Sequence, residues 1–301
     1  MTKTTHIAGI LFASIFGFSF LFSKIALAYV TPIGLIAYRF LTAFIVFEVL
    51  RLTKVIKINI HLSQLKYLGL VALFQPILYF LFETFGLNLV SSGEAGMMIA
   101  LIPIFVAILS ALIIKEKPKP LQIVFIFVSI LGVILIQLSK LNTQSDSEFL
   151  GFVLLLLAVI SAALFNIASR TASTKGLRPM EVTYFMMLFG ALMFNIIYLV
   201  QLVLEERVRD YITNLYHIEI LLPILYLGII ASIGGFFLVN LVLSKVPAHI
   251  SSIYANISTI VAIIAGVIIL NESLTLLQVI GSILIITAVY GTVRLNKRAQ
   301  K

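Results

Sequence analysis

The sequence predicts an all-α membrane protein with ten transmembrane helices arranged as two inverted five-helix repeats. Three observations predict this fold class: the composition, the number of apolar stretches and an internal repeat. Of the 301 residues, 61% are hydrophobic and 11% are charged, and the mean hydropathy is +1.16. Soluble domains have roughly 25% charged residues, so this composition does not suit a water-exposed surface. We therefore expect a single membrane domain over residues 1–301, with no separate soluble domain.

Ten apolar stretches are long enough to cross a bilayer, whose hydrocarbon core takes about 20 helical residues. They are continuously apolar and do not alternate with polar residues, which indicates helices and not the strands of a barrel. The predicted spans are residues 7–29, 32–50, 66–87, 93–114, 120–139, 149–169, 180–204, 220–243, 249–270 and 275–293. The longest connection, residues 205–219, spaces its apolar side chains as a short interfacial helix would, although a polar loop is an equal alternative.

The distribution of lysine and arginine predicts the orientation of the chain in the membrane. If the N-terminus is cytoplasmic, 16 of these residues fall on the inner side and three, Lys140, Arg207 and Arg209, fall on the outer side. Cytoplasmic loops carry an excess of positive charge. We therefore expect a multi-pass protein of the cell (inner) membrane with both termini in the cytoplasm, and we assign the net charge of +9 to this orientation and not to a nucleic-acid partner.

The second half of the sequence repeats the first at an offset of 156 residues. Glu116 and Gln122 fall on Glu272 and Gln278, at the same span junction in each half. Each half holds five spans, an odd number, so the halves enter the bilayer in opposite directions. Transporters use such inverted repeats for alternating access around a site near the midplane. The predicted repeats are residues 1–142 and 149–301.

Two cations within the spans are candidates for substrate binding. Lys24 and Arg39 lie five to seven residues from the outer ends of their helices, which is about 7–10 Å at 1.5 Å per residue. An uncompensated cation at this depth costs roughly 2–3 kcal/mol or more. Either they hold an anionic group of a substrate, or they pair with Glu83 and Glu94 as an outer gate. The same two carboxylates are the candidates for gating and for uptake of a coupling proton.

The third predicted span has a polar stripe. Gln75, Tyr79, Phe82 and Glu83 recur at helical spacing and share one face. Facing lipid would leave their polar groups unsatisfied, so the stripe either lines a cavity or joins helices. Pro76 in the same span predicts a kink.

In the second half, the candidates for substrate binding are amides and one phenol. Such groups also serve as hydrogen bonds between membrane helices, so both roles stay open. The residues are Asn166, Asn240, Tyr254 and Asn256.

Several kinds of chemistry have no signature in the sequence. There is no G-x-x-x-x-G-K-[ST] loop for nucleotide phosphates, no H-E-x-x-H metal motif and no cysteine. We therefore expect no cofactor, no bound metal, no catalytic residues and no enzyme activity.

The order of the sequence motifs resembles a known family. GFSFLFSK at 17–24, Pro32, YRF at 38–40 and Pro103 before IIKEKP resemble the first repeat of the EamA-like family of the drug/metabolite transporter superfamily. The ending IILNESLTLLQVIGSILI resembles its second repeat. The resemblance covers nearly the whole chain and implies ten helices in two inverted repeats, with export or exchange of small metabolites or drugs.

Taken together, the sequence predicts a secondary transporter that moves a small polar or amphipathic metabolite, such as an amino acid or related compound, by alternating access. Export is the favoured direction. The alternatives are an importer or exchanger of the same fold, an integral-membrane enzyme that modifies lipids, and a scaffold. The expected partners are the small-molecule substrate and the lipid bilayer, with protons as a candidate coupling ion; the oligomeric state is unknown.

Overall fold

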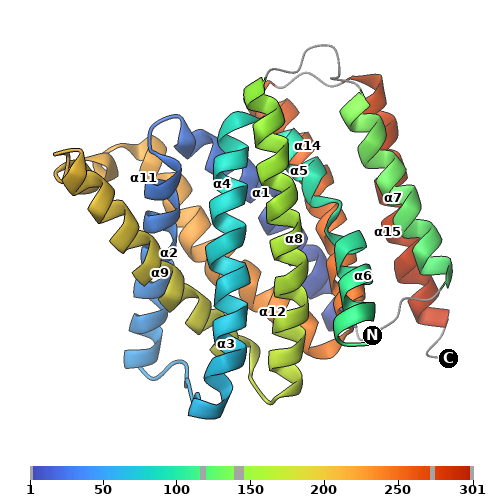
Figure 1. Ribbon diagram of the computed structural model, residues 1–301, viewed down its shortest axis with the longest axis horizontal. Helices are drawn as coiled ribbons and strands as arrows, with labels where there is room; N and C mark the ends of the chain where they lie inside the picture. Colours follow the sequence, from blue (N-terminus) through green and yellow to red (C-terminus); the bar gives the residue numbers. More distant parts are fainter. Residues whose placement is uncertain (1–2, 116–119, 139–145, 272–274, 299–301) are drawn as a thin grey trace.

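A computed structural model describes residues 3–115, 120–138, 146–271 and 275–298, and every regular element among them is a helix. Figure 1 shows these helices side by side as one bundle. Eight helical segments of the described residues are long and apolar enough to cross a membrane, which confirms a helical, multi-pass architecture. They are Lys3–Leu27, Pro32–Leu52, Leu62–Leu89, Ser92–Ile113, Asp146–Thr174, Pro179–Leu204, Ile218–Lys245 and Ala248–Leu270.

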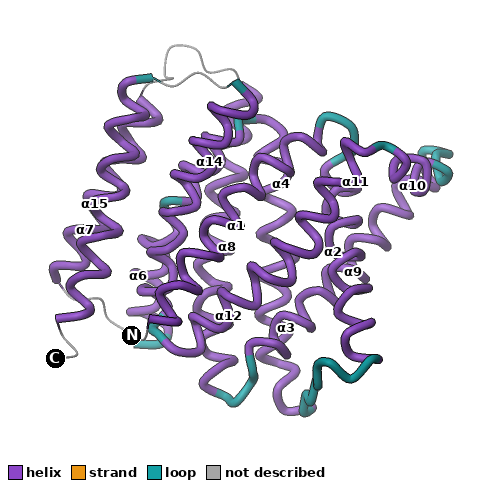
Figure 2. Tube along the Cα trace, turned by 180° about the vertical axis from the view of Figure 1, so that it is seen from behind, coloured by secondary structure: helices purple, strands orange, loops and turns teal. Residues whose placement is uncertain are grey.

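Two further helices occupy the remaining predicted spans, 120–139 and 275–293. They are α7, Pro120–Leu138, and α15, Leu276–Arg298. Figure 2 shows α7 and α15 as a pair at one side of the bundle. Glu116 and Glu272, which mark the repeat in the sequence, lie outside the described residues.

The two halves of the chain share the same order of elements. Each begins with two continuous helices, which are α1 (Lys3–Leu27) and α2 (Pro32–Leu52) in the first half and α8 (Asp146–Thr174) and α9 (Pro179–Leu204) in the second. The next span is interrupted by a stretch of π-helix. Its elements are α3 (Leu65–Ala72), η2 (Leu73–Leu78) and α4 (Tyr79–Leu89), and in the second half α11 (Ile218–Leu225), η4 (Tyr226–Gly235) and α12 (Phe236–Lys245).

The fourth segment of each half is also discontinuous. The third span of the first half also includes the short 3-10 helix η1 (Leu62–Gln64), which leads directly into α3. The fourth segment consists of α5 (Ser92–Ile99) and α6 (Ile102–Ile113) in the first half, and of α13 (Ala248–Ser251), η5 (Ser252–Tyr254) and α14 (Ala255–Leu270) in the second.

Pro76 breaks the third span, as the sequence predicts. Proline has no backbone N–H to donate, and it disfavours helical angles in the residue before it. Gln75 accordingly has φ −152° and ψ 116°, far from helical values. The break turns the chain within the bundle and places Gln75 on its interior side, where its side chain is buried.

Small residues allow the central helices to approach closely. α1 packs along α14, which packs along α5. A Cβ on Gly17 would lie 2.4 Å from Cβ of Val261, and one on Gly96 would lie 2.6 Å from Cβ of Ala262. Because lipid tails give little driving force for helix association, such close packing contributes much of the attraction between membrane helices.

Both termini lie at the same end of the bundle (Figure 1). At that end, the loop of residues 53–61 is bonded to the start of α9, where the Asn59 backbone N–H donates to Oε1 of Glu181 over 3.3 Å. At the opposite end, the Tyr38 hydroxyl of α2 donates to the Tyr211 carbonyl over 2.8 Å. A segment of the first half therefore bonds the start of α9, and a segment of the second half bonds the first part of α2.

Of the two alternatives for residues 205–219, the structure shows a short helix. It consists of α10, Asp210–Thr213, and the 3-10 turn η3, Asn214–Tyr216. Only part of its apolar stripe packs inward. Tyr211 and Leu215 pack against the core, whereas Tyr216 is 79% exposed.

Candidate functional site

A cavity lies between the two halves of the chain. It contains about 710 Å³ of atom-free space, including the part open to its surroundings. Helices α1, α2, α4, α5 and α6 of the first half line it together with α8, α12, α13 and α14 of the second half. Binding sites for small molecules are typically concave and mostly apolar, with a few convergent polar groups. The cavity is therefore the candidate binding site for a small molecule.

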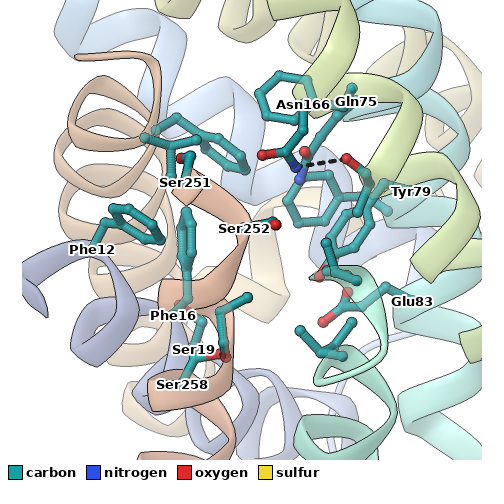
Figure 3. A pocket seen from close by; sticks show the side chains of 18 of the residues that line it. Phe12, Phe16, Ser19, Gln75, Tyr79, Glu83, Asn166, Ser251, Ser252 and Ser258 are labelled. Atoms are coloured by element: carbon teal, nitrogen blue, oxygen red, sulfur yellow. Dashed lines mark hydrogen bonds between the residues drawn. The ribbon is translucent and has the colours of Figure 1, made fainter. Parts of the chain in front are cut away.

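The third span supplies one polar wall of the cavity. Gln75, Tyr79 and Glu83 lie on successive turns and line the cavity, and Figure 3 shows all three on the same side of it. Gln75 and Glu83 are only 6% and 4% exposed. One carboxylate oxygen of Glu83 accepts a 2.9 Å hydrogen bond from the hydroxyl of Thr84. Three of the four residues in the predicted stripe thus meet in the cavity, and Phe82 is not among the lining residues.

Arg39 brings a positive charge to the same cavity from α2. Its side chain is 4% exposed, and its Nε donates to the hydroxyl of Ser232 over 2.8 Å. Its guanidinium carbon lies 4.4 Å from the ring centre of Phe80. Among the described residues no ion pair joins Arg39 to Glu83, although both line the cavity. A cavity with both signs of charge suits a ligand that carries one or both opposite charges.

Aromatic side chains form the apolar part of the lining. Phe12, Phe16 and Phe20 follow one another along α1 at intervals of four residues. Three more phenylalanines line the cavity from α4, α8 and α12: Phe80, Phe165 and Phe236. In Figure 3, Phe12 and Phe16 lie across the cavity from Tyr79 and Glu83. The sequence analysis did not identify these residues. Their spacing was the available signal, but in a helix that is apolar throughout it does not stand out.

Asn166 is the one predicted second-half residue that lines the cavity. Its Nδ2 donates to the Ala162 carbonyl over 2.8 Å, the bond drawn in Figure 3. Hydroxyl groups from η5 and its flanking helices lie nearby in the lining, which adds donors and acceptors for a polar ligand. They belong to Ser251, Ser252 and Ser258.

Lys24 and Glu94 lie outside the cavity lining and contact the ends of helices. The Lys24 ammonium donates to the carbonyls of Leu87 and Val90, over 3.0 and 2.5 Å, where α4 ends. These carbonyls lack partners within their own helix, and a cation also complements the negative end of the helix dipole. Glu94 accepts from the Ser91 backbone N–H over 2.8 Å and so caps the start of α5.

Asn240, Tyr254 and Asn256 also lie outside the lining, and each bonds a side chain of another helix. Asn240 donates to Thr183 over 2.8 Å and accepts from Ser169 over 2.6 Å. The Tyr254 hydroxyl lies 2.6 Å from Nδ1 of His6, and Asn256 donates to Ser129 over 3.0 Å. These three residues join helices in this structure. The structure therefore brings together Arg39, Gln75, Tyr79, Glu83 and Asn166, and it separates the other five candidates from them.

Comparison with known proteins identifies the family. The model of the EamA-like transporter family matches residues 3–138 and again residues 149–294. The chain is 36% identical to the uncharacterized transporter YcxC of Bacillus subtilis, over 98% of this chain and 95% of the relative. It is 25% identical to a probable amino-acid metabolite efflux pump of Escherichia coli, over 96% of this chain and 95% of the pump.

A solved structure supports the fold. One crystal structure of a protein that is 15% identical superposes with a TM-score of 0.71 and covers 100% of both chains. Two matches to one family model, together with the helical bundle, establish that this chain is a multi-pass membrane protein and a transporter of the EamA-like family.

Proposed function

We propose that the protein is a secondary transporter that exports a small amphipathic metabolite, an amino acid or related compound, by alternating access. The observation that carries this proposal is the composition of the cavity. Arg39 and Glu83 supply opposite charges, while phenylalanines of both halves supply apolar surface. An amino acid with an apolar side chain presents the matching groups: a carboxylate, an ammonium and a hydrocarbon part.

The architecture in this proposal consists of ten transmembrane helices in two inverted repeats, residues 1–142 and 149–301. The shared element order, the π-helical stretches η2 and η4, and the two separate matches to the family model support it. A matching contact gives further support. Lys24 near the end of α1 bonds the carbonyls that end α4, and Arg170 of α8 bonds the Leu243 carbonyl near the end of α12 over 3.1 Å.

In the proposed cycle, the cavity opens alternately to the two sides as the halves rearrange around it. Both termini and the loop of residues 53–61 are cytoplasmic in the cell (inner) membrane, an orientation supported by the positive charge at that end. The name of the Escherichia coli relative, an efflux pump for amino-acid metabolites, favours export over import or exchange. Protons are the proposed coupling ion, with Glu83 as the group that carries them.

Counterflow in liposomes containing the purified protein tests the transport proposal. Liposomes loaded with one unlabelled compound at a time, drawn from apolar, hydroxylated and acidic amino acids and their amines, are diluted into the labelled compound. We expect accumulation of at least one amino acid with an apolar side chain, and its loss in Arg39→Ala protein that inserts normally. Labelled compounds that never accumulate above empty liposomes would contradict the substrate class.

A further inference from the structure

Arg39 is held at two points, and neither uses the end of its guanidinium group. Its Nε donates to the hydroxyl of Ser232 over 2.8 Å, and Ser232 is fully buried within the π-helical stretch η4 of the second half. Ser232 is not one of the residues that line the cavity, whereas Arg39 is. The hydroxyl therefore contacts the arginine from behind and has no contact of its own with the cavity.

Phe80 holds the guanidinium group against the face of its ring. The Cζ atom of Arg39 lies 4.4 Å from the ring centre of Phe80, a distance at which a cation is attracted to the ring face. Three other rings pack edge to face against Phe80, with centres 5.0 Å away in Phe40, 5.0 Å away in Tyr79 and 6.0 Å away in Phe236. The position of the guanidinium group thus depends on packed rings of both halves.

The two Nη groups of Arg39 remain for a ligand. Within the described residues, the hydrogen bond to Ser232 is the one that the Arg39 side chain makes, and the residue is 4% exposed. Among the described residues, the fully buried polar atoms without a partner do not include either Nη of Arg39. Both donors therefore remain accessible from the cavity, where a hydrogen bond to a charged partner would be favourable. The terminal edge of a guanidinium group matches a carboxylate in a planar, two-bond geometry that a lysine ammonium cannot reproduce.

We infer that Ser232 is a positioning residue which, with Phe80, orients Arg39 to bind a planar carboxylate in the cavity. This inference rests on the proposed function, because it names the part of the substrate that Arg39 recognises. It also adds a condition. Arg39 keeps its hydrogen bond to Ser232 only while η4 of the second half lies against α2 of the first. The affinity for a carboxylate therefore depends on how the two halves are packed.

Two probes of matched shape and opposite charge test the inference: 3-phenylpropionate, which has the carboxylate alone, and 2-phenylethylamine, which has the ammonium alone. Their rings suit the phenylalanine lining. Binding is measured by equilibrium dialysis against the purified full-length chain in lipid nanodiscs. Ser232→Ala should raise the Kd for 3-phenylpropionate by about tenfold, the loss expected from one positioning hydrogen bond. It should change the Kd for 2-phenylethylamine by less than about twofold.

Conservative variants separate positioning from folding. Ser232→Thr keeps the hydroxyl and should bind 3-phenylpropionate nearly as wild type does. Arg39→Lys keeps the charge but lacks the planar fork, so it should lose about tenfold or more. Ser161→Ala removes a buried hydroxyl that bonds its own helix, to the Leu157 carbonyl over 2.8 Å, and should leave both Kd values unchanged.

Each possible result of these binding experiments supports or overturns the inference. If Ser232→Ala weakened the binding of both probes equally, Ser232 would have a general structural role. If Ser232→Ala left the Kd for 3-phenylpropionate unchanged, Ser232 would have no positioning role. Wild-type protein that binds no 3-phenylpropionate would overturn the carboxylate site. If the expected pattern of binding appears while counterflow fails for every compound, the transport proposal fails and the inference stands.

Discussion

The ammonium of Lys24 lies 3.0 Å from the carbonyl oxygen of Leu87, at the far end of a different helix. Arg170 makes the corresponding contact with Leu243 in the second half, over 3.1 Å. In each half, a cation near the end of the first helix bonds the carbonyls that end the third span. Because an unpaired carbonyl in a membrane is costly, these bonds stabilise the interrupted spans where they meet the neighbouring helix.

We therefore expect Lys24→Met to reduce stability more than ligand binding. The loss of hydrogen bonds from a charged donor should cost about 1.5–3 kcal/mol, seen as a lower melting temperature of the purified protein. The Kd for cavity probes should stay within about twofold of wild type. Arg170→Met should behave in the same way. A Lys24→Met protein with normal melting temperature and lost binding would instead place Lys24 at the substrate.

Close packing of α1 on α14 gives a second prediction. Gly17→Ala would bring a Cβ to 2.4 Å from Val261 Cβ and 2.8 Å from the Ser258 carbonyl, so it should destabilise the protein by about 1–3 kcal/mol. Gly69→Ala is the matched control, because nothing lies within 4 Å of its added Cβ, and alanine favours a helix by roughly 0.5–1 kcal/mol. Thermal unfolding in detergent measures both. Equal melting temperatures would show that α1 and α14 separate readily.

Orientation in the membrane can be tested directly, because the chain contains no cysteine. Tyr216 is 79% exposed at the end of the bundle opposite the termini, and Lys57 is exposed in the loop at the end with the termini. A cysteine at position 216 should react with a membrane-impermeant thiol reagent in intact cells. A cysteine at position 57 should react only after the membrane is permeabilised. The opposite pattern would reverse the proposed orientation and with it the meaning of export.

Glu83→Gln tests coupling to protons. The amide keeps the size and most hydrogen-bonding capacity of the side chain but cannot ionise. Exchange of substrate across liposome membranes should continue, whereas net transport should lose its dependence on an imposed pH gradient. Glu181→Gln, which changes a carboxylate that bonds Arg178 and Asn59 outside the cavity lining, is the control for the loss of a buried charge. A full response to the gradient in Glu83→Gln would point to another coupling group or to facilitated diffusion.

The spans and the polar stripe could be predicted from the sequence because both depend on local spacing. Twenty apolar residues in a row have few alternatives to a membrane helix, and Gln75, Tyr79 and Glu83 must share a face of any helix that contains them. The spacing was also compatible with the short helix at Asp210–Thr213. The packing of Tyr211 on Tyr38, however, depends on a residue 173 positions away in the sequence.

The roles of isolated polar residues could not be predicted in the same way. A buried amide or ammonium must find partners, but a substrate, a neighbouring hydroxyl and the carbonyls of a helix end satisfy this requirement equally well. The sequence places Lys24 and Arg39 at similar distances from the ends of their helices. In the structure, however, Lys24 bonds the end of α4 and Arg39 lines the cavity. Only the packing of distant helices distinguishes them. Ser232 shows the same limit, since its partner Arg39 is 193 residues away.

The phenylalanine lining also bears on what the protein keeps out. Water forms continuous chains poorly along apolar walls, and narrow apolar passages in channels close to ions by drying. Phe12, Phe16 and Phe20 of α1 share the lining with phenylalanines of α4, α8 and α12, and these rings have no group that could carry a proton from one water molecule to the next. The rings can contact the apolar part of an amphipathic molecule, but they offer protons and other ions no polar path along their side of the cavity.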